Sequence, residues 1–293
     1  MIPVTTIGGY LGAGKTTVVN HLLRHANGAR FAILVNEFGQ LAIDEDLIIA
    51  QGDEMISIAG GCICCSFGDN LVGAMMDLAA LDPAPDHIVI EASGVAIPGS
   101  IAASVSLLSG FRHDGIVVLA DAETISTRAQ DKYVGDTILR QLADADILLL
   151  TKTDLISASQ CRETIDWLGQ LGSSARIVPI SDGKVAPEIL LDQFARHDPY
   201  PSSPHSDRLF ESISIELAAP CDARAFAQAL VDPTLGIIRA KGHVTDHCGA
   251  RTLIQIVGER FEVTASDIPA KDEIVCIGLS GRLNIEGIKS LAN

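Results

Sequence analysis

A glycine-rich segment near the start of the chain has the residue types needed to hold phosphate groups. It reads Gly9-Tyr10-Leu11-Gly12-Ala13-Gly14-Lys15-Thr16 and fits the pattern G-x-x-x-x-G-K-S/T. Gly12 and Gly14 allow backbone N–H groups to turn toward phosphate oxygens, and the following helix adds the positive end of its dipole. Lys15 is expected to reach the β- and γ-phosphates, and the Thr16 hydroxyl to bind Mg²⁺. The alternative is a glycine-rich turn with a surface lysine.

A second motif points to the base of the nucleotide. Thr151-Lys152-Thr153-Asp154 follows an apolar run and resembles the guanine motif N-K-x-D, with Thr151 in the place of Asn. The Asp154 carboxylate can accept hydrogen bonds from guanine N1–H and the 2-amino group, whereas adenine lacks that amine. Thr151 is shorter than Asn and cannot make the same double contact, so moderate guanine affinity is expected. The alternative is a strand end at which Asp154 caps the next helix.

Acidic residues follow two other strands. Glu91 ends the run His87–Glu91 and is placed to hold Mg²⁺ through water, while the N–H group of Gly94 can sense the γ-phosphate. Asp121 ends the next strand. It is either a second carboxylate on the same edge of the sheet or a residue that caps the following turn. Glu37, after the second strand, can reach the Mg²⁺ region, a catalytic water or a thiol site, or is simply a surface acid on a loop.

Three thiols lie within four residues, in Gly60-Gly61-Cys62-Ile63-Cys64-Cys65-Ser66. Cys62 and Cys64 share one face if the segment is extended, and a turn can bring Cys65 round. Thiolates select Zn²⁺ or Cu(I) over hard ions, and three thiols leave a four-coordinate ion one ligand short. An open fourth position suits metal transfer. A buried inert cluster and a redox pair are the alternatives.

The elements that must position these residues alternate between strands and helices. This alternation predicts a doubly wound parallel α/β sheet over residues 1–196, then a linker rich in Pro and Ser at 197–207, and a smaller α+β domain at 208–293. Expected strands in the first domain are Val4–Gly8, Phe31–Asn36, His87–Ala92, Gly115–Asp121, Ala145–Lys152 and Arg176–Ser181, with helices at Lys15–His25, Gly68–Leu81, Gly135–Ala143 and Ser157–Leu171. In the second, strands are expected at Leu209–Leu217, Leu235–Val244, Arg251–Val257 and Ile274–Leu279, and helices at Asp222–Val231 and Asn284–Ala292.

Composition excludes several classes of protein. The 293 residues include 37 acids and 21 bases, so a net charge of −16 argues against binding to nucleic acid or to anionic membranes. Hydrophobic residues make up 47% but aromatic ones only 4%, which favours buried parallel strands over membrane spans. Seven cysteines, with no visible secretory signal at the N-terminus, indicate a reduced cytoplasmic protein.

Five segments, taken in order along the chain, resemble the CobW-type metallochaperone GTPases. These are relatives of the nickel-delivery GTPases of urease and hydrogenase maturation. The five segments are Gly8–Thr17, Asn36–Gly39, Gly61–Cys65, Glu91–Gly94 and Thr151–Asp154, and Gly236–Gly242 looks like the family's C-terminal signature. The resemblance implies a GTPase whose cycle couples to binding and delivery of a transition metal, often zinc. It also implies that the Glu37 loop is a switch and that the C-terminal domain meets the client. Gln40 stands where many members have an acid.

The leading hypothesis is therefore GTP hydrolysis with Mg²⁺, coupled to transfer of a transition metal to a client metalloprotein. Lys15, Glu37 and Glu91 are the expected catalytic residues; the expected nucleotide contacts are Gly9, Gly12, Ala13, Gly14, Lys15, Thr16, Thr17, Gly94, Thr151, Lys152 and Asp154. Cys62, Cys64 and Cys65 are the expected transition-metal ligands. His243, His247 and Cys248 are better interpreted as a surface loop. Rival hypotheses are a nucleotide-gated scaffold with a structural metal and a small-molecule kinase. Because related GTPases often dimerise across the nucleotide, a homodimer is a further hypothesis.

Overall fold

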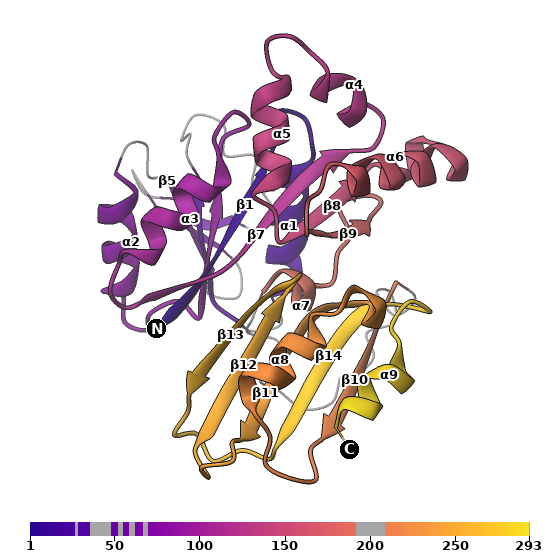
Figure 1. The fold of residues 1–293 in the computed structure, drawn as a ribbon. Coiled ribbons are helices and arrows are strands. Elements are labelled where there is room, and N and C mark those ends of the chain that lie inside the picture. Colours follow the sequence, from indigo (N-terminus) through magenta and orange to yellow (C-terminus); the bar gives the residue numbers. More distant parts are fainter. Residues whose placement is uncertain are drawn as a thin grey trace. The chain divides into compact units, whose positions relative to one another are not determined.

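The computed structural model describes two compact units (Figure 1). They span Met1–Gln193 and Phe194–Asn293, and each is described by itself. The described residues are 1–26, 29–35, 70–191 and 209–292, together with the backbone of 48–51, 55–58 and 62–66. Glu37, the linker at 197–207 and the side chains of the three clustered cysteines lie outside them.

The first unit is built on a nine-stranded sheet with the strand order β3-β4-β5-β2-β6-β1-β7-β8-β9. Pairing is parallel from β5 through to β9, which confirms the predicted doubly wound α/β class. Among the described strands, β4 runs antiparallel to both of its neighbours, and β3, β4 and β5 were not among the predicted strands. The strands are β1 (Ile2–Gly9), β2 (Phe31–Val35), β3 (Ile48–Gln51), β4 (Met55–Ile58), β5 (Cys62–Ser66), β6 (His87–Glu91), β7 (Phe111–Asp121), β8 (Ile147–Thr151) and β9 (Arg176–Pro179).

Helices cover both faces of this sheet. On one face, buried side chains of β7 and β8, such as Val118 and Leu150, pack with Ile138 of α5 and Leu168 of α6. On the same face Val105 of α3 and Leu78 of α2 cover β1, β2 and β6. Figure 1 shows α1 behind the sheet, on the opposite face. The helices are α1 (Lys15–Arg24), α2 (Leu71–Ala79), α3 (Pro98–Ser106), α4 (Ile125–Ala129), α5 (Gly135–Ala143), α6 (Ala158–Gln170) and α7 (Pro187–Leu190).

Helix starts follow local chemistry. Ser157 and Gln160 form a capping box at α6, where the sequence predicts a helix. The helix predicted from Gly68 begins at Leu71. The Asn70 side chain accepts a hydrogen bond from the N–H group of Gly73 and so caps the start of this helix. Helix α3 was missed, although Pro98 occupies its first turn, where a missing N–H costs nothing. Its small residues carry little helical periodicity.

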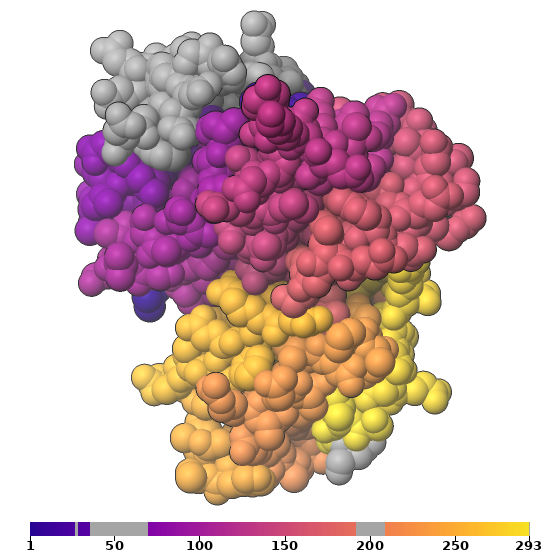
Figure 2. Space-filling model, turned by 45° about the horizontal axis from the view of Figure 1, so that its top comes forward, coloured from indigo at the N-terminus to yellow at the C-terminus, as the bar shows by residue number. Residues whose placement is uncertain are grey.

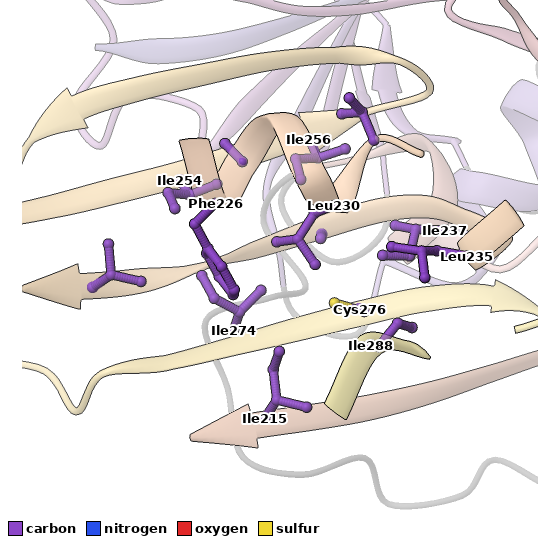
Figure 3. Packing of buried hydrophobic residues seen from close by; sticks show 14 of the residues in the cluster. Ile215, Phe226, Leu230, Leu235, Ile237, Ile254, Ile256, Ile274, Cys276 and Ile288 are labelled. Atoms are coloured by element: carbon purple, nitrogen blue, oxygen red, sulfur yellow. The ribbon is translucent and has the colours of Figure 1, made fainter. Parts of the chain in front are cut away.

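The second unit is an antiparallel sheet with the order β10-β14-β11-β12-β13, covered by helices. Phe226 and Leu230 of α8 lie over Ile254, Ile256 and Ile274 (Figure 3). This confirms the predicted α+β class; of the described elements in this unit, strand β13 and the 3₁₀ helix η6 were not predicted. The elements are β10 (Phe210–Glu216), α8 (Ala223–Leu230), the 3₁₀ helix η6 (Pro233–Leu235), β11 (Ile237–Thr245), β12 (Arg251–Val257), β13 (Arg260–Ala265), β14 (Glu273–Leu279) and α9 (Ile285–Leu291).

Among the described helices, none has both the length and the apolar character needed to cross a membrane.

Candidate nucleotide and metal site

The glycine-rich loop joins β1 to α1 and has the backbone shape that its sequence predicts. Gly9, Gly12 and Gly14 have φ values of 128°, 78° and 94°, which favour glycine. A Cβ on Gly9 would lie 2.5 Å from the carbonyl oxygen of Leu119, so this position also needs glycine for space. Helix α1 starts at Lys15 without a side-chain cap, which leaves the N–H groups of its first turn available to an anion.

Three of the predicted site residues, Lys15, Thr16 and Glu91, lie close together at the start of α1. The Thr16 hydroxyl donates to Oε1 of Glu91 at 3.0 Å. The Lys15 ammonium donates to the carbonyl oxygen of Gly9 at 2.7 Å. Burial lowers the pKa of Lys15, while the negative charge of Glu91 opposes that shift. Burial likewise raises the pKa of Glu91, against the opposing effects of Thr16 and Lys15. A buried carboxylate, a hydroxyl and an ammonium group therefore share one end of the helix.

The segment that begins at Gly94 is held against the phosphate loop. A Cβ on Gly94 would lie 2.5 Å from Cδ2 of Leu11, so the two backbones approach closely only because residue 94 is glycine. Gln141 of α5 donates its amide N–H groups to the carbonyl oxygens of Gly94 and Ala96, at 3.1 and 2.8 Å. Sequence reasoning missed Gln141. Its signal in the sequence is its spacing, since Gln141 follows Ile138 by three residues and so lies on the apolar face of a predicted helix.

The predicted base motif is tied to the phosphate loop by its first residue. The buried Thr151 hydroxyl bonds to the carbonyl oxygens of Ala13, at 2.9 Å, and Ala120, at 3.2 Å. Lys152 has a positive φ of 57°, and its ammonium pairs with Asp121 at 2.7 Å. Asp121 also accepts the N–H of Glu123, so this carboxylate acts as a cap and an ion-pair partner.

A loop after β9 completes the same edge of the sheet, and the sequence analysis assigned it no role. The Thr153 hydroxyl donates to the carbonyl oxygen of Ile180 at 3.0 Å, which ties the base motif to this loop. A Cβ on Gly183 would lie 2.7 Å from Cγ2 of Thr17 in α1. The signal was present as Ser-Asp-Gly directly after a predicted strand, where ligand-binding loops occur in α/β sheets.

Arg128 of α4 contacts the phosphate loop from outside. It donates to the carbonyl oxygen of Leu11 at 3.0 Å and lies over the Tyr10 ring, 5.4 Å from its centroid. Figure 2 shows the magenta surface to which the α4–α5 region contributes. A hollow of about 700 Å³ opens there, lined by Tyr10, Leu11, Gly12, Arg128, Asp131, Tyr133 and Val134.

The thiol segment is a strand whose backbone ends level with Glu91. In β5 the backbone is extended from Cys62 to Ser66, so the turn expected at Cys65 is absent from this described stretch. Across the sheet Ser66 pairs with Val35, which in turn pairs with Glu91. Elsewhere, the described side chains contain no group of three or more His, Cys, Asp or Glu residues arranged to hold a metal ion.

Comparison with protein families matches residues 3–179 to the CobW/HypB/UreG nucleotide-binding domain. The chain belongs to this family. Residues 210–291 match the cobalamin synthesis protein cobW C-terminal domain. The CobW/HypB/UreG assignment confirms the resemblance stated from the motifs and places the chain among the P-loop GTPases.

Named relatives and a solved structure are similar to much of the chain. The zinc chaperone CobW of Sinorhizobium sp is 32% identical, over 89% of this chain and 86% of its own. The zinc chaperone YjiA of Escherichia coli is 34% identical over 63% of this chain and 59% of its own. The crystal structure of the Zn(II)-bound YjiA GTPase has a TM-score of 0.53 and 26% identity, and the match covers 99% of this chain and 97% of that one.

Proposed function

We propose that this chain binds and hydrolyses GTP and uses the cycle to control binding of a transition metal, zinc in the first instance, and its transfer to a client protein. The proposal draws on the family membership, and on relatives that are named zinc chaperones and zinc-regulated GTPases. It assigns the nucleotide to the end of the sheet where β1, β6 and β8 finish.

In this proposal the phosphate loop does the electrostatic work. Lys15 and the N–H groups at the start of α1 stabilise negative charge on the transferring phosphoryl group. Gly94, held by Gln141, senses the γ-phosphate through its backbone N–H. Asp154 selects the guanine base while Lys152 lies beside it, and Glu37 orients the attacking water.

Thr16 and Glu91 fit a magnesium ion. Their oxygens lie 3.0 Å apart at the phosphate end of α1, and hard oxygen donors are the ligands that Mg²⁺ prefers. Thr16 would bind the ion directly and Glu91 through water. When bound, Mg²⁺ would supply positive charge that neutralises negative charge on the phosphates.

The observation that carries the coupling is the register across β5, β2 and β6. Ser66, at the end of the thiol strand, is level with Val35 and Glu91. Neighbouring strands lie about 4.8 Å apart, so the end of β5 is roughly 10 Å from that of β6. A movement near Glu91 on loss of the γ-phosphate would thus reach the thiol ligands Cys62, Cys64 and Cys65 through a single intervening strand, and such coupling is typically about 1–3 kcal/mol.

We further propose residues 1–196 as the GTPase domain, 197–207 as a linker and 208–293 as the domain that meets the client. Light scattering with and without a GTP analogue would test the homodimer hypothesis.

Calorimetric titration of zinc tests the proposal directly. The ion is added to nucleotide-free protein, to the GDP complex and to the complex with a non-hydrolysable GTP analogue. We expect zinc affinity to differ between the nucleotide states by about 5- to 150-fold, the range of a typical coupling. Equal affinity in all three states would refute coupling and favour the scaffold hypothesis. Release of ADP from ATP with a small-molecule acceptor would favour a kinase.

Two sets of variants separate the sites. Lys15→Ala should abolish phosphate release from GTP, and normal turnover in this variant would refute the phosphate assignment. Replacing Cys62, Cys64 and Cys65 together by Ser should sharply weaken zinc binding. The matched control is Cys248→Ser, since this thiol is exposed in the second unit. If the triple variant binds zinc like the control, the thiol assignment is wrong.

A further inference from the structure

Two histidines stack at the far end of α1, away from the phosphate loop. His21 and His25 are four residues apart, so they lie on the same face of the helix. Their ring centroids are 4.1 Å apart, and the ring planes are inclined by 34°. His21 is half-buried and His25 is exposed, so the pair opens to solvent on one side. Neither ring takes part in the nucleotide site described above.

Each ring has one nitrogen engaged by the backbone. Nδ1 of His25 lies 2.8 Å from the carbonyl oxygen of His21, and a ring N–H group there donates to that oxygen. The His21 ring hydrogen-bonds to the backbone of Val185, in the loop after β9. Each imidazole therefore keeps one nitrogen lone pair for a ligand bond. Histidines that bind metal ions usually donate their other N–H in this way, which sets the tautomer and the ring orientation.

The surroundings of His21 keep its free nitrogen unprotonated. The helix ends here, and its last carbonyl groups carry the negative end of the helix dipole. Burial, with the nearby charges of His25 and Lys184, lowers the pKa of His21 to about 4, so this ring stays neutral at physiological pH. The charge of Lys184 opposes a cation, but its ammonium is paired with Asp182 at 3.2 Å.

We propose that His21 and His25 form a second, bidentate zinc site, with water completing the coordination. Two histidines at this spacing on one helix face are a known zinc-binding arrangement. With Zn–N bonds of about 2.0–2.1 Å, two ligand nitrogens around a tetrahedral ion lie roughly 3.3 Å apart. The two rings, whose centroids are 4.1 Å apart, would turn so that their free nitrogens face the same ion. The site uses no residue of the thiol segment. A zinc ion here would join α1, which begins at Lys15, to the loop that contains Val185.

The test isolates this pair from the thiols. In a full-length background in which Cys62, Cys64 and Cys65 are replaced by Ser, zinc is titrated in competition with a chromophoric zinc indicator. We expect one remaining ion per chain. Adding His25→Ala should weaken the binding of this ion at least about tenfold. In other metal sites, even the loss of a contact that only supports a ligand weakens binding by about that factor. The control is His247→Ala, which removes an exposed histidine of the second unit.

A second measurement needs no variant of the half-buried His21. The ¹⁵N imidazole resonances of the background protein are followed during the titration, and both rings should shift together up to one equivalent of zinc. The proposal is overturned if the background protein binds no zinc, if His25→Ala binds like His247→Ala, or if the shifting resonances belong to other histidines. The phosphate and thiol assignments would be untouched by any of these results.

Discussion

The hydrogen bond from Thr151 to Ala13 gives the sharpest quantitative prediction. In Thr151→Val a methyl group replaces the hydroxyl at almost the same volume, so the change removes two contacts without opening a cavity. Thr151 is only 3% exposed, and its single hydroxyl hydrogen is shared by the carbonyl oxygens of Ala13 and Ala120, which lie 2.9 and 3.2 Å from the hydroxyl oxygen. The change removes this shared hydrogen bond. A hydrogen bond contributes about 0.5–1.5 kcal/mol net, and a buried acceptor left unpaired costs about 1–3 kcal/mol.

We expect about 1.4 kcal/mol of this loss to appear in nucleotide binding, because Ala13 lies within the phosphate loop and its position is set by Thr151. That is a tenfold increase in the dissociation constant for GDP. A fluorescent GDP analogue measures it by direct titration. The matched control is Thr164→Val, which removes a hydroxyl bonded to the carbonyl oxygen of Gln160 on an exposed part of α6.

The reasoning is refuted if Thr151→Val binds GDP within twofold of the Thr164→Val control. A second result also bears on it. If Thr151→Val lowers the melting temperature without changing GDP affinity, the contact stabilises the fold but does not organise the phosphate loop.

Three further predictions concern other buried groups. Burial raises the pKa of Glu91 above its usual 4.5, so the stability that this group contributes is lost as pH rises through the folded-state pKa. The Glu91→Gln variant should therefore have a higher melting temperature than the parent at pH 7 without nucleotide. Equal melting temperatures would contradict this prediction. Gln141→Leu removes hydrogen bonds from one buried carbonyl oxygen, that of Gly94, and one partly buried carbonyl oxygen, that of Ala96. We therefore expect slower GTP hydrolysis and a loss of about 1–3 kcal/mol in unfolding free energy, while unchanged turnover would remove Gln141 from the site. Burial raises the pKa of the Cys276 thiol to about 12, so iodoacetamide at pH 8 should label the exposed Cys248 and not Cys276. Mass spectrometry measures the labelling, and labelling of Cys276 in the folded protein would refute its burial.

Much of the first unit was predictable because its signals are local. The phosphate loop needs glycines at fixed spacing between a strand and a helix, and the structure has this arrangement at Gly9–Lys15. Apolar runs predicted the strands in the middle of the sheet. The strands β3, β4 and β5 were not among the predicted strands. They are four or five residues long, and they lack the run of aliphatic residues that marks β2 and β8.

The sequence by itself determined which chemical groups are present, and that several of them follow strands of one parallel sheet. Local spacing is sufficient for this, since a strand and the helix after it are set by neighbouring residues. Only the tertiary structure decided which of these groups touch. Gln141 reaches Gly94 across 47 residues, and Thr151 reaches Ala13 across 138, so both contacts depend on how the helices and strands pack. The stacked His21 and His25 are near in sequence, but the hydrogen bond to Val185 that orients His21 comes from packing the loop after β9 against α1.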